Sequence, residues 1–244
     1  MNICRKKLNN MNANEISKRL QKMGDKKDAR FLQGFFKTGA GQYGEGDIFL
    51  GIRVPAVRKL AEEFRNLPLE EALLLLKSPF HEERLFVLIL FVNAFAKGDE
   101  TIRKKIYDLY LANTDCINNW DLVDVSAPKI VGAYLFTKSR KTLYRLVKSK
   151  SLWERRIAVL ATFYFIKYKQ FDDALKIAEL LLKDKEDLIH KAVGWMLREA
   201  GKRDIERAES FLKAHCRTMP RTMLRYAIER YTPSKRKKFL DGTV

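Results

Sequence analysis

The chain of 244 residues is 46% hydrophobic and 32% charged, which predicts a folded protein and excludes a disordered chain. Its 48 basic and 30 acidic residues give a formal charge of +18, which is typical of proteins that bind a polyanion such as nucleic acid. The longest apolar run, residues 85–92, is far shorter than the roughly 20 residues that cross a bilayer, and the basic N-terminus lacks the apolar region of a signal peptide.

Apolar residues recur at helical spacing along most of the chain, whereas the alternating pattern of strands is nearly absent. In chain order, helices are predicted to start at Asn14, Pro68 and Asp172, where side-chain oxygens or the acids that follow suit exposed N–H groups. We expect an all-α protein with one continuous domain, in which helices pair through short polar turns. Its parts are an N-terminal helix and glycine-rich loop to about residue 55, repeats over about residues 56–231, and a basic tail over residues 232–244.

The glycine-rich segment at residues 39–46 contains the spacing G-x-G-x-x-G. The dinucleotide-binding fingerprint requires a strand that turns into a helix, and here the loop continues into residues 48–55, so we reject that function. The segment is either a plain connector or a loop whose backbone amides, together with Tyr43 and Arg53, contact a phosphate backbone.

An internal repeat follows the loop. Three segments share a charged start and an apolar continuation, namely residues 82–95, 153–168 and 188–200. Matching positions recur at steps of 36, 36 and 35 residues, at Arg84, Trp120, Arg156 and Lys191. Such a period is typical of HEAT-type helical hairpins, in which the same side of every repeat faces one surface. The sequence therefore predicts a curved α-solenoid with a concave basic groove that suits a duplex.

The cysteines Cys4, Cys116 and Cys216 lie far apart, and the three histidines show no metal-binding spacing with them or with one another. We expect reduced thiols, no metal and no cofactor, in a cytoplasmic protein that is associated with the nucleoid if its source is prokaryotic. The nucleophile signatures of the common hydrolase families are also absent from the sequence.

A tryptophan and a carboxylate occur together in the middle of the chain. Trp120 and Asp124 are four residues apart and therefore share one helix face. Asp121 points about 100° away from Trp120, and Asn118 or Asn119 suits the N-cap position. Core packing is the alternative role for Trp120, because a tryptophan at helical spacing is usually buried.

Two downstream features favour a functional role for this pair. Trp195 lies two repeats after Trp120 and has a basic residue, Arg198, one turn away. Arg155 and Arg156 occupy the repeat between the two tryptophans, where they could clamp a phosphate. The sequence thus predicts two aromatic plates with a cationic position between them.

Four separated segments resemble the AlkD-like DNA alkylation repair proteins, which are glycosylases built from HEAT-like repeats. The segments are FLGIRVP at residues 49–55, WDLVD at 120–124, WERR at 153–156 and KAVGWMLRE at 191–199. They follow one another in the order of the family, and the resemblance spans roughly residues 18–231.

The resemblance implies roles for individual residues. Trp120 and Trp195 resemble the tryptophans that pack against the lesion nucleotide, and Asp124 resembles the catalytic carboxylate. Arg156 resembles an arginine that contacts phosphate near the lesion, and Arg198 is expected to make a further DNA contact. These five residues form the predicted site.

Further contacts are expected around this site. Tyr43 matches an aromatic residue of the family with a one-residue offset in the glycine-rich loop. Lys191, Arg84 and Arg53 are expected to contact phosphates without regard to base sequence.

The resemblance also implies the activity, which is hydrolysis of the N-glycosidic bond of cationic N3-methyladenine and N7-methylguanine in double-stranded DNA during base excision repair. Because the base already carries positive charge, no general acid is required, and one carboxylate, Asp124, could stabilise oxocarbenium character and orient water. The family is known for capturing the lesion without a deep pocket.

Two other functions remain open from the sequence. One is a non-catalytic HEAT-like repeat protein that binds branched DNA or a protein partner, since fold does not fix function. The other is an RNA-binding repeat protein, although no one-base-per-repeat pattern of side-chain pairs is evident. We expect the protein to be a monomer.

Overall fold

The computed structural model describes residues 12–244, in which α-helices follow one another, with a long connection over residues 36–53 and shorter ones elsewhere. Within this range no β-strand occurs, and Ile48 and Phe80 form an isolated bridge. The prediction of an all-α fold is confirmed. Among the described residues, no helix combines the length and apolar character that a bilayer crossing requires.

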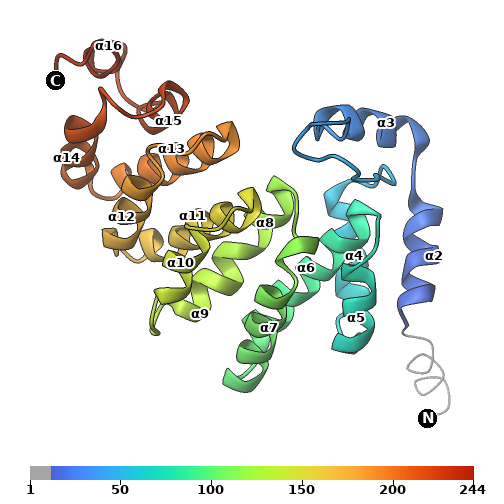
Figure 1. The fold of residues 1–244 in the computed structure, drawn as a ribbon. Helices are drawn as coiled ribbons and strands as arrows, with labels where there is room; N and C mark the ends of the chain where they lie inside the picture. Colours follow the sequence, from blue (N-terminus) through green and yellow to red (C-terminus); the bar gives the residue numbers. More distant parts are fainter. Residues whose placement is uncertain (1–11) are drawn as a thin grey trace. The chain divides into compact units, whose positions relative to one another are not determined.

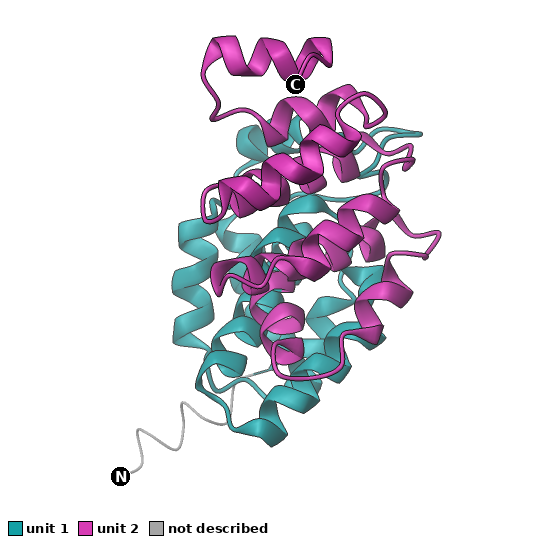
Figure 2. Cartoon of the chain, turned by 90° about the vertical axis from the view of Figure 1, so that its left-hand side faces the viewer, with its two compact units in different colours: residues 1–126 teal, residues 127–244 magenta. Residues whose placement is uncertain are grey.

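The chain divides into two compact units, of which unit 1 ends at Ser126 and unit 2 covers residues 127–244 (Figure 2). In chain order (Figure 1), the helices up to the boundary are α2 (Ala13–Met23), α3 (Lys26–Phe35), α4 (Val54–Glu63), α5 (Leu69–Leu76), α6 (His81–Lys97), α7 (Glu100–Ala112), the short 3-10 helix η1 (Thr114–Cys116) and α8 (Trp120–Ala127). The single continuous domain expected from the sequence stays a prediction.

Unit 2 begins in a π-helical turn and continues through further helices. They are η2 (Pro128–Gly132), α9 (Ala133–Leu135), α10 (Lys141–Leu146), α11 (Leu152–Lys167), α12 (Asp172–Leu180), α13 (Asp187–Gly201), α14 (Ile205–His215), α15 (Arg221–Ala227) and α16 (Pro233–Asp241).

Helix α6 is the centre of unit 1, where α4, α5 and α7 pack against it and α2 packs on α5 and α6. Every residue from His81 to Phe91 is buried, including the charged first turn. A helix that is apolar nearly all round is stable only when other elements surround it, which the neighbouring helices provide. The burial of His81 and Arg84 in this first turn is the feature that shapes the site described below.

Two of the three helix starts expected from the sequence are found, and the third has a different capping residue. Asn12, rather than Asn14, caps α2, because its side-chain oxygen accepts the Glu15 amide hydrogen at 2.9 Å. Helix α5 follows Pro68 and α12 begins at Asp172, as the sequence predicts.

In unit 2 four helices form a layer in which η2 packs on α11, α11 on α13 and α13 on α15. Helices α10, α12 and α14 pack on this layer, so the unit repeats a two-helix motif. Two glycines let neighbouring helices approach closely. A Cβ added at Gly132 would lie 2.3 Å from the Ala161 carbonyl oxygen, and one at Gly194 would lie 2.4 Å from that of Met223.

Candidate active site

Trp120 is the first residue of α8 and is half-buried. Its ring stacks on Phe36 with centroids 5.0 Å apart and an interplanar angle of 14°, and Phe35 meets it edge-on at 6.1 Å. Both phenylalanines lie at the end of α3. This helix end therefore fixes the orientation of the indole while leaving part of the ring accessible.

Asp124 lies one turn after Trp120 on α8 and is also half-buried. The hydroxyl of the buried residue Tyr110 pairs with Ser126 at 2.9 Å. Burial raises the pKa of Tyr110, and the negative charge of Asp124 raises it further, which places the carboxylate near this hydroxyl. The aromatic ring and the carboxylate that the sequence singles out thus share one helix.

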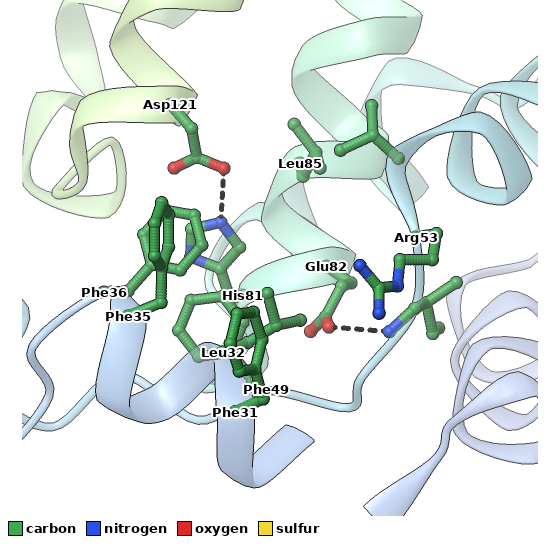
Figure 3. A pocket seen from close by; sticks show the side chains of 12 residues that line it. Phe31, Leu32, Phe35, Phe36, Phe49, Arg53, His81, Glu82, Leu85 and Asp121 are labelled. Carbon is green, nitrogen blue, oxygen red and sulfur yellow. Dashed lines mark hydrogen bonds and ion pairs between the residues drawn. The ribbon is translucent and has the colours of Figure 1, made fainter. Parts of the chain in front are cut away.

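Below Trp120, the buried imidazole of His81 joins two segments. Its Nδ1 lies 2.8 Å from Asp47 in the glycine-rich loop, and its Nε2 lies 2.9 Å from Asp121 on α8 (Figure 3 shows the second contact). Asn119 precedes α8, accepts the Trp120 amide hydrogen at 2.8 Å and donates to Asp47 at 3.0 Å. The loop, α6 and the start of α8 are therefore tied together, and the Phe36 ring lies against both the imidazole and the indole.

Both carboxylates favour the charged form of His81. Burial alone would lower the pKa of His81, but the charge of Asp121 and the hydrogen bonds to Asp121 and Asp47 raise it to about 9. Burial also raises the pKa of Asp47, and His81 and Arg84 together outweigh it and hold this pKa below its usual value. At neutral pH the imidazole is a cation that donates two hydrogen bonds.

Arg84 belongs to the same buried network. Its side chain pairs with Asp47 and donates to the Ser78 carbonyl at 2.9 Å, and the residue is only 5% exposed. In contrast to the expectation from the sequence, this guanidinium lies in the interior, because it compensates the buried charge of Asp47. The structure gives it a role in holding the loop, and the phosphate contact expected for it stays a prediction.

A second carboxylate, Glu82, holds the segment that follows the loop. Its oxygens accept the amide hydrogens of Leu50, Gly51 and Ile52 at 2.8, 2.8 and 3.1 Å. Gly51 has a φ of 86°, and a Cβ there would lie 2.2 Å from the Asp25 carbonyl oxygen. Only glycine fits this crossing of α3 and the loop, which explains the glycine of the FLGIRVP segment.

The other two predicted contacts of unit 1 lie near its surface. Arg53 is exposed and forms a two-point ion pair with Asp28, at 2.9 and 3.0 Å. Tyr43 is half-buried, and its hydroxyl donates to the Phe35 carbonyl at 3.5 Å. Both side chains are accessible enough for the DNA contact that remains predicted for them.

In unit 2, helix α13 carries three of the predicted residues. Trp195 is half-buried, with its ring 6.0 Å from that of Phe163. Lys191 pairs with Asp187 at 2.8 Å, and Arg198 pairs with Glu229. The three residues share one helix, and their contacts with DNA stay predictions.

Arg156 on α11 is 5% exposed, and its Nη1 donates to the Leu188 carbonyl at 2.7 Å. Its neighbour Arg155 pairs with Asp184 at 2.6 Å and donates to the Ser149 carbonyl at 3.0 Å. Arg156 thus joins α11 to α13 within the core, and the phosphate contact implied for it stays a prediction.

The structure therefore brings together two groups of predicted residues, one in each unit. The first consists of Trp120 and Asp124 on α8, and the second is centred on Trp195 on α13. Among residues 12–244, no group of three histidine, cysteine, aspartate or glutamate side chains could hold a metal ion.

Sequence reasoning missed the groups beneath Trp120. Asp47, His81 and Asp121 lie 34 to 40 residues apart at successive steps and carry no spacing signature. Phe35 and Phe36 read as ordinary apolar residues at the end of an amphipathic helix. The charged first turn of α6, inside an otherwise apolar segment, was the one available signal, because buried charges are rare unless paired.

The fold and the site are typical of nucleic-acid-binding helical-repeat proteins. The chain is all-α and strongly basic, and an aromatic ring shares a helix with a carboxylate. A family model described as DNA alkylation repair enzyme matches residues 16–231, and the chain belongs to this family. The resemblance seen in the sequence is thereby confirmed. The family makes the protein an enzyme of DNA repair, with DNA as its partner.

A solved structure has a similar fold. It is described as a predicted DNA alkylation repair enzyme from Enterococcus faecalis, is 16% identical, and superposes with a TM-score of 0.66 over 86% of this chain and 98% of the other. No curated protein matches the chain.

Proposed function

We propose that the protein is a monofunctional DNA glycosylase that hydrolyses the N-glycosidic bond of cationic alkylated purines, namely N3-methyladenine and N7-methylguanine, in duplex DNA. The observation that carries the proposal is the pairing of Trp120 with Asp124 on one helix, with both side chains half-buried, in a member of the DNA alkylation repair family. A purely structural tryptophan would not need a partly exposed carboxylate beside it.

The proposed reaction needs one placed carboxylate. As the bond between C1′ and the base nitrogen breaks, its electron pair neutralises the cationic base, and positive charge moves onto the deoxyribose. Asp124 stabilises this charge and orients a water molecule, whose oxygen bonds to C1′ while its proton passes to the carboxylate or to solvent. At about 4 Å and an effective dielectric constant of about 20, the attraction is roughly 4 kcal/mol, or about three decades in rate.

The remaining predicted residues hold the nucleic acid in this proposal. Trp120 packs against the lesion nucleotide and offers a π face to the developing cation. Trp195, Lys191 and Arg198 on α13 supply further contacts with DNA. Selectivity for cationic lesions follows from their intrinsic lability, so a neutral lesion such as hypoxanthine is expected to be a poor substrate.

The test is to incubate the protein with methylated genomic DNA and to quantify released bases by chromatography. Asp124→Asn should lower the release of N7-methylguanine about 1000-fold, because the negative charge is lost while the shape is kept. Trp120→Ala should weaken release as well. Asp108→Asn is the matched control, since Asp108 is an exposed aspartate on α7 that pairs with Lys104, and it should leave the rate unchanged.

The proposal fails if the wild-type protein releases neither N7-methylguanine nor N3-methyladenine. A protein that binds duplex DNA normally but is indifferent to Asp124→Asn would instead be a non-catalytic binding module. Efficient release of hypoxanthine would contradict the proposed source of selectivity.

A further inference from the structure

The positive charge of the chain is concentrated in unit 2. This unit contains 28 basic and 13 acidic residues, whereas unit 1 contains 20 basic and 17 acidic residues. At the start of unit 2, residues 127–153 contain seven basic residues and no acidic one. Like charges that gather on one part of a fold repel one another, so they indicate a surface that meets a polyanion.

Helix α10 and the turn that ends it carry three of these cations on one face. Lys141, Arg145 and Lys148 follow one another at spacings of four and three residues, and all three are exposed. Leu143 and Leu146 of the same helix are buried, and α10 packs on α11 (Figure 1). The three cations therefore point away from α11, which together with α13 carries the DNA contacts predicted for unit 2.

A fourth cation, Lys169, lies at one end of this face. The side chain of Arg140 pairs with Asp173 and donates to Gln170, which brings the segments before α10 and after α11 together. Because Lys141 follows Arg140 and Lys169 precedes Gln170, the two lysines lie in the same part of the surface.

Lys169 occupies a backbone position that favours glycine. Its φ is 60°, in the left-handed region, and its amide donates to the Ile166 carbonyl at 3.0 Å where α11 ends. Glycine is the usual residue at such a helix end, because a side chain there costs free energy. A lysine at this position lowers the stability of the fold, which a functional contact would explain.

We call Lys141, Arg145, Lys148 and Lys169 the outer basic face. Within residues 12–244 none of the four takes part in an ion pair. The equivalent helices of the following repeats differ in charge, because α12 contains three acidic residues and α14 contains two, whereas α10 contains none. The basic face is therefore particular to this repeat and is not a general property of the outer helices.

A phosphate backbone fits this face better than an acidic protein segment. Protein interfaces depend on aromatic or apolar anchors, and no large apolar residue of α10 is exposed. Tyr168, the exposed aromatic residue beside Lys169, already packs on the rings of Phe136 and Tyr164. Exposed cations without fixed partners are typical of sequence-independent phosphate contacts, and DNA is the partner of the family.

We propose that the outer basic face binds a second segment of duplex DNA, distinct from the segment that meets the predicted lesion site. One protein molecule then holds two duplex segments and can move from one to the other without passing through solution. The inference goes beyond the glycosylase activity and does not depend on it, because it concerns phosphate contacts and no bond cleavage.

The first test is native mass spectrometry of the full chain with a short undamaged duplex, which should detect one chain with two duplexes. In a titration followed by fluorescence anisotropy, Lys141→Ala/Arg145→Ala/Lys148→Ala should weaken binding of the second duplex at least about tenfold. The salt slope of this second step should become shallower by about 3, because three phosphate contacts are lost. Binding of the first duplex should change less than about twofold.

The matched control is Lys18→Ala/Lys22→Ala/Lys59→Ala, which removes the same charge from exposed lysines of α2 and α4 in unit 1. It should leave binding of the second duplex unchanged. An equal loss in both triple variants would mean that net charge alone holds the second duplex, and this would overturn the proposal.

A second pair of variants separates binding from stability. Lys169→Gly should raise the urea midpoint of unfolding, because glycine relieves the left-handed backbone, and should weaken binding of the second duplex about threefold. Lys37→Gly is its control, since Lys37 is exposed and also has a positive φ, of 52°. It should raise the midpoint in the same way and leave the second duplex bound. Full binding of the second duplex by Lys169→Gly would overturn the proposal.

Four further results would overturn it. They are a single duplex bound per wild-type chain, a second duplex bound only when a second chain is present, equal weakening of both binding steps by the α10 variant, and displacement of the second duplex by polyglutamate as readily as by unlabelled duplex. The last result would indicate an acidic protein segment as the occupant. The substituted residues are exposed, so the variants are expected to fold, which a thermal denaturation curve checks.

Discussion

His81 is a buried cation between two carboxylates, and this makes the stability of unit 1 depend on pH. The pKa of its imidazole rises from 6.5 to about 9 on folding, through Asp121 and Asp47, with Arg84 on the far side of Asp47. Protonated His81 therefore contributes stability that is fully present below pH 6.5 and is lost as the pH rises through about 9. The full contribution is about 3 kcal/mol.

We expect the free energy of unfolding, measured with urea between pH 6 and pH 10, to fall over the upper part of this range. His81→Gln should abolish this decrease and should be less stable than the wild type at pH 6, because glutamine cannot carry the charge that the two aspartates require. His215→Gln is the control, since His215 lies on α14 of unit 2 and is not part of this network. A wild-type curve as flat as that of His81→Gln would contradict the role of this cation.

At this scale the sequence predicted that Trp120 and Asp124 share a helix, but not which side chains surround them. Spacing placed Trp120 and Asp124 on one face, which the structure keeps, because four residues on a helix always lie together. The sequence predicts no functional contact for Asp121, which points away from Trp120. In the structure Asp121 pairs with His81, which lies on α6. Contacts between residues 34 or 40 positions apart depend on tertiary packing and leave no periodic signal.

Among the elements, the close approach of α13 and α15 depends on Gly194. A Cβ at this position would lie 2.4 Å from the Met223 carbonyl oxygen and 2.6 Å from Cβ of Tyr226. Gly194→Ala should therefore lower the free energy of unfolding by about 1 to 3 kcal/mol, although alanine is the better helix former.

Gly34→Ala provides the contrasting case within a helix. Gly34 lies in α3, and nothing is found within 4 Å of a Cβ added there. Alanine should raise the free energy of unfolding there by up to about 1 kcal/mol through helix propensity alone. Urea unfolding of the two variants checks both signs, and a stabilised Gly194→Ala would show that the two helices separate without cost.

The sequence predicts a repeat, but the structure aligns its later copies one residue earlier than the sequence does. Arg84, Arg155 and His190 each hydrogen-bond the backbone carbonyl six residues earlier, and each is the fourth residue of its helix. The alignment from the sequence pairs Arg84 with Arg156 and Lys191, which share a positive charge. Charge does not identify the equivalent residues, because in the third copy His190 makes the same contact with a carbonyl through a ring nitrogen.

For the whole molecule, the charge of +18 predicts DNA binding that weakens steeply with salt. With about six phosphates neutralised, the logarithm of the association constant should fall with the logarithm of salt concentration with a slope near −5. Fluorescence anisotropy of a labelled duplex between 50 and 300 mM salt measures this slope; these concentrations span roughly the range over which such contacts are lost.

Arg53→Ala should make the slope shallower by about 1, because Arg53 is predicted to contact one phosphate. Arg65→Ala is the matched control, since Arg65 is likewise exposed and pairs with an acid, Glu62. A slope near zero for the wild-type protein would remove the electrostatic basis of binding. An equal effect of both substitutions would mean that net charge alone matters.

The hydrogen bonds that Glu82 accepts from the amides of Leu50, Gly51 and Ile52 make local opening of this segment observable. These three amide hydrogens exchange with solvent only when their hydrogen bonds to Glu82 break, because they lie where the loop crosses α3 and α6. Their exchange rates therefore report how often this segment opens locally, separately from unfolding of the rest of unit 1. Local opening of unit 1 can therefore be followed by amide hydrogen exchange at these three residues, without an added label.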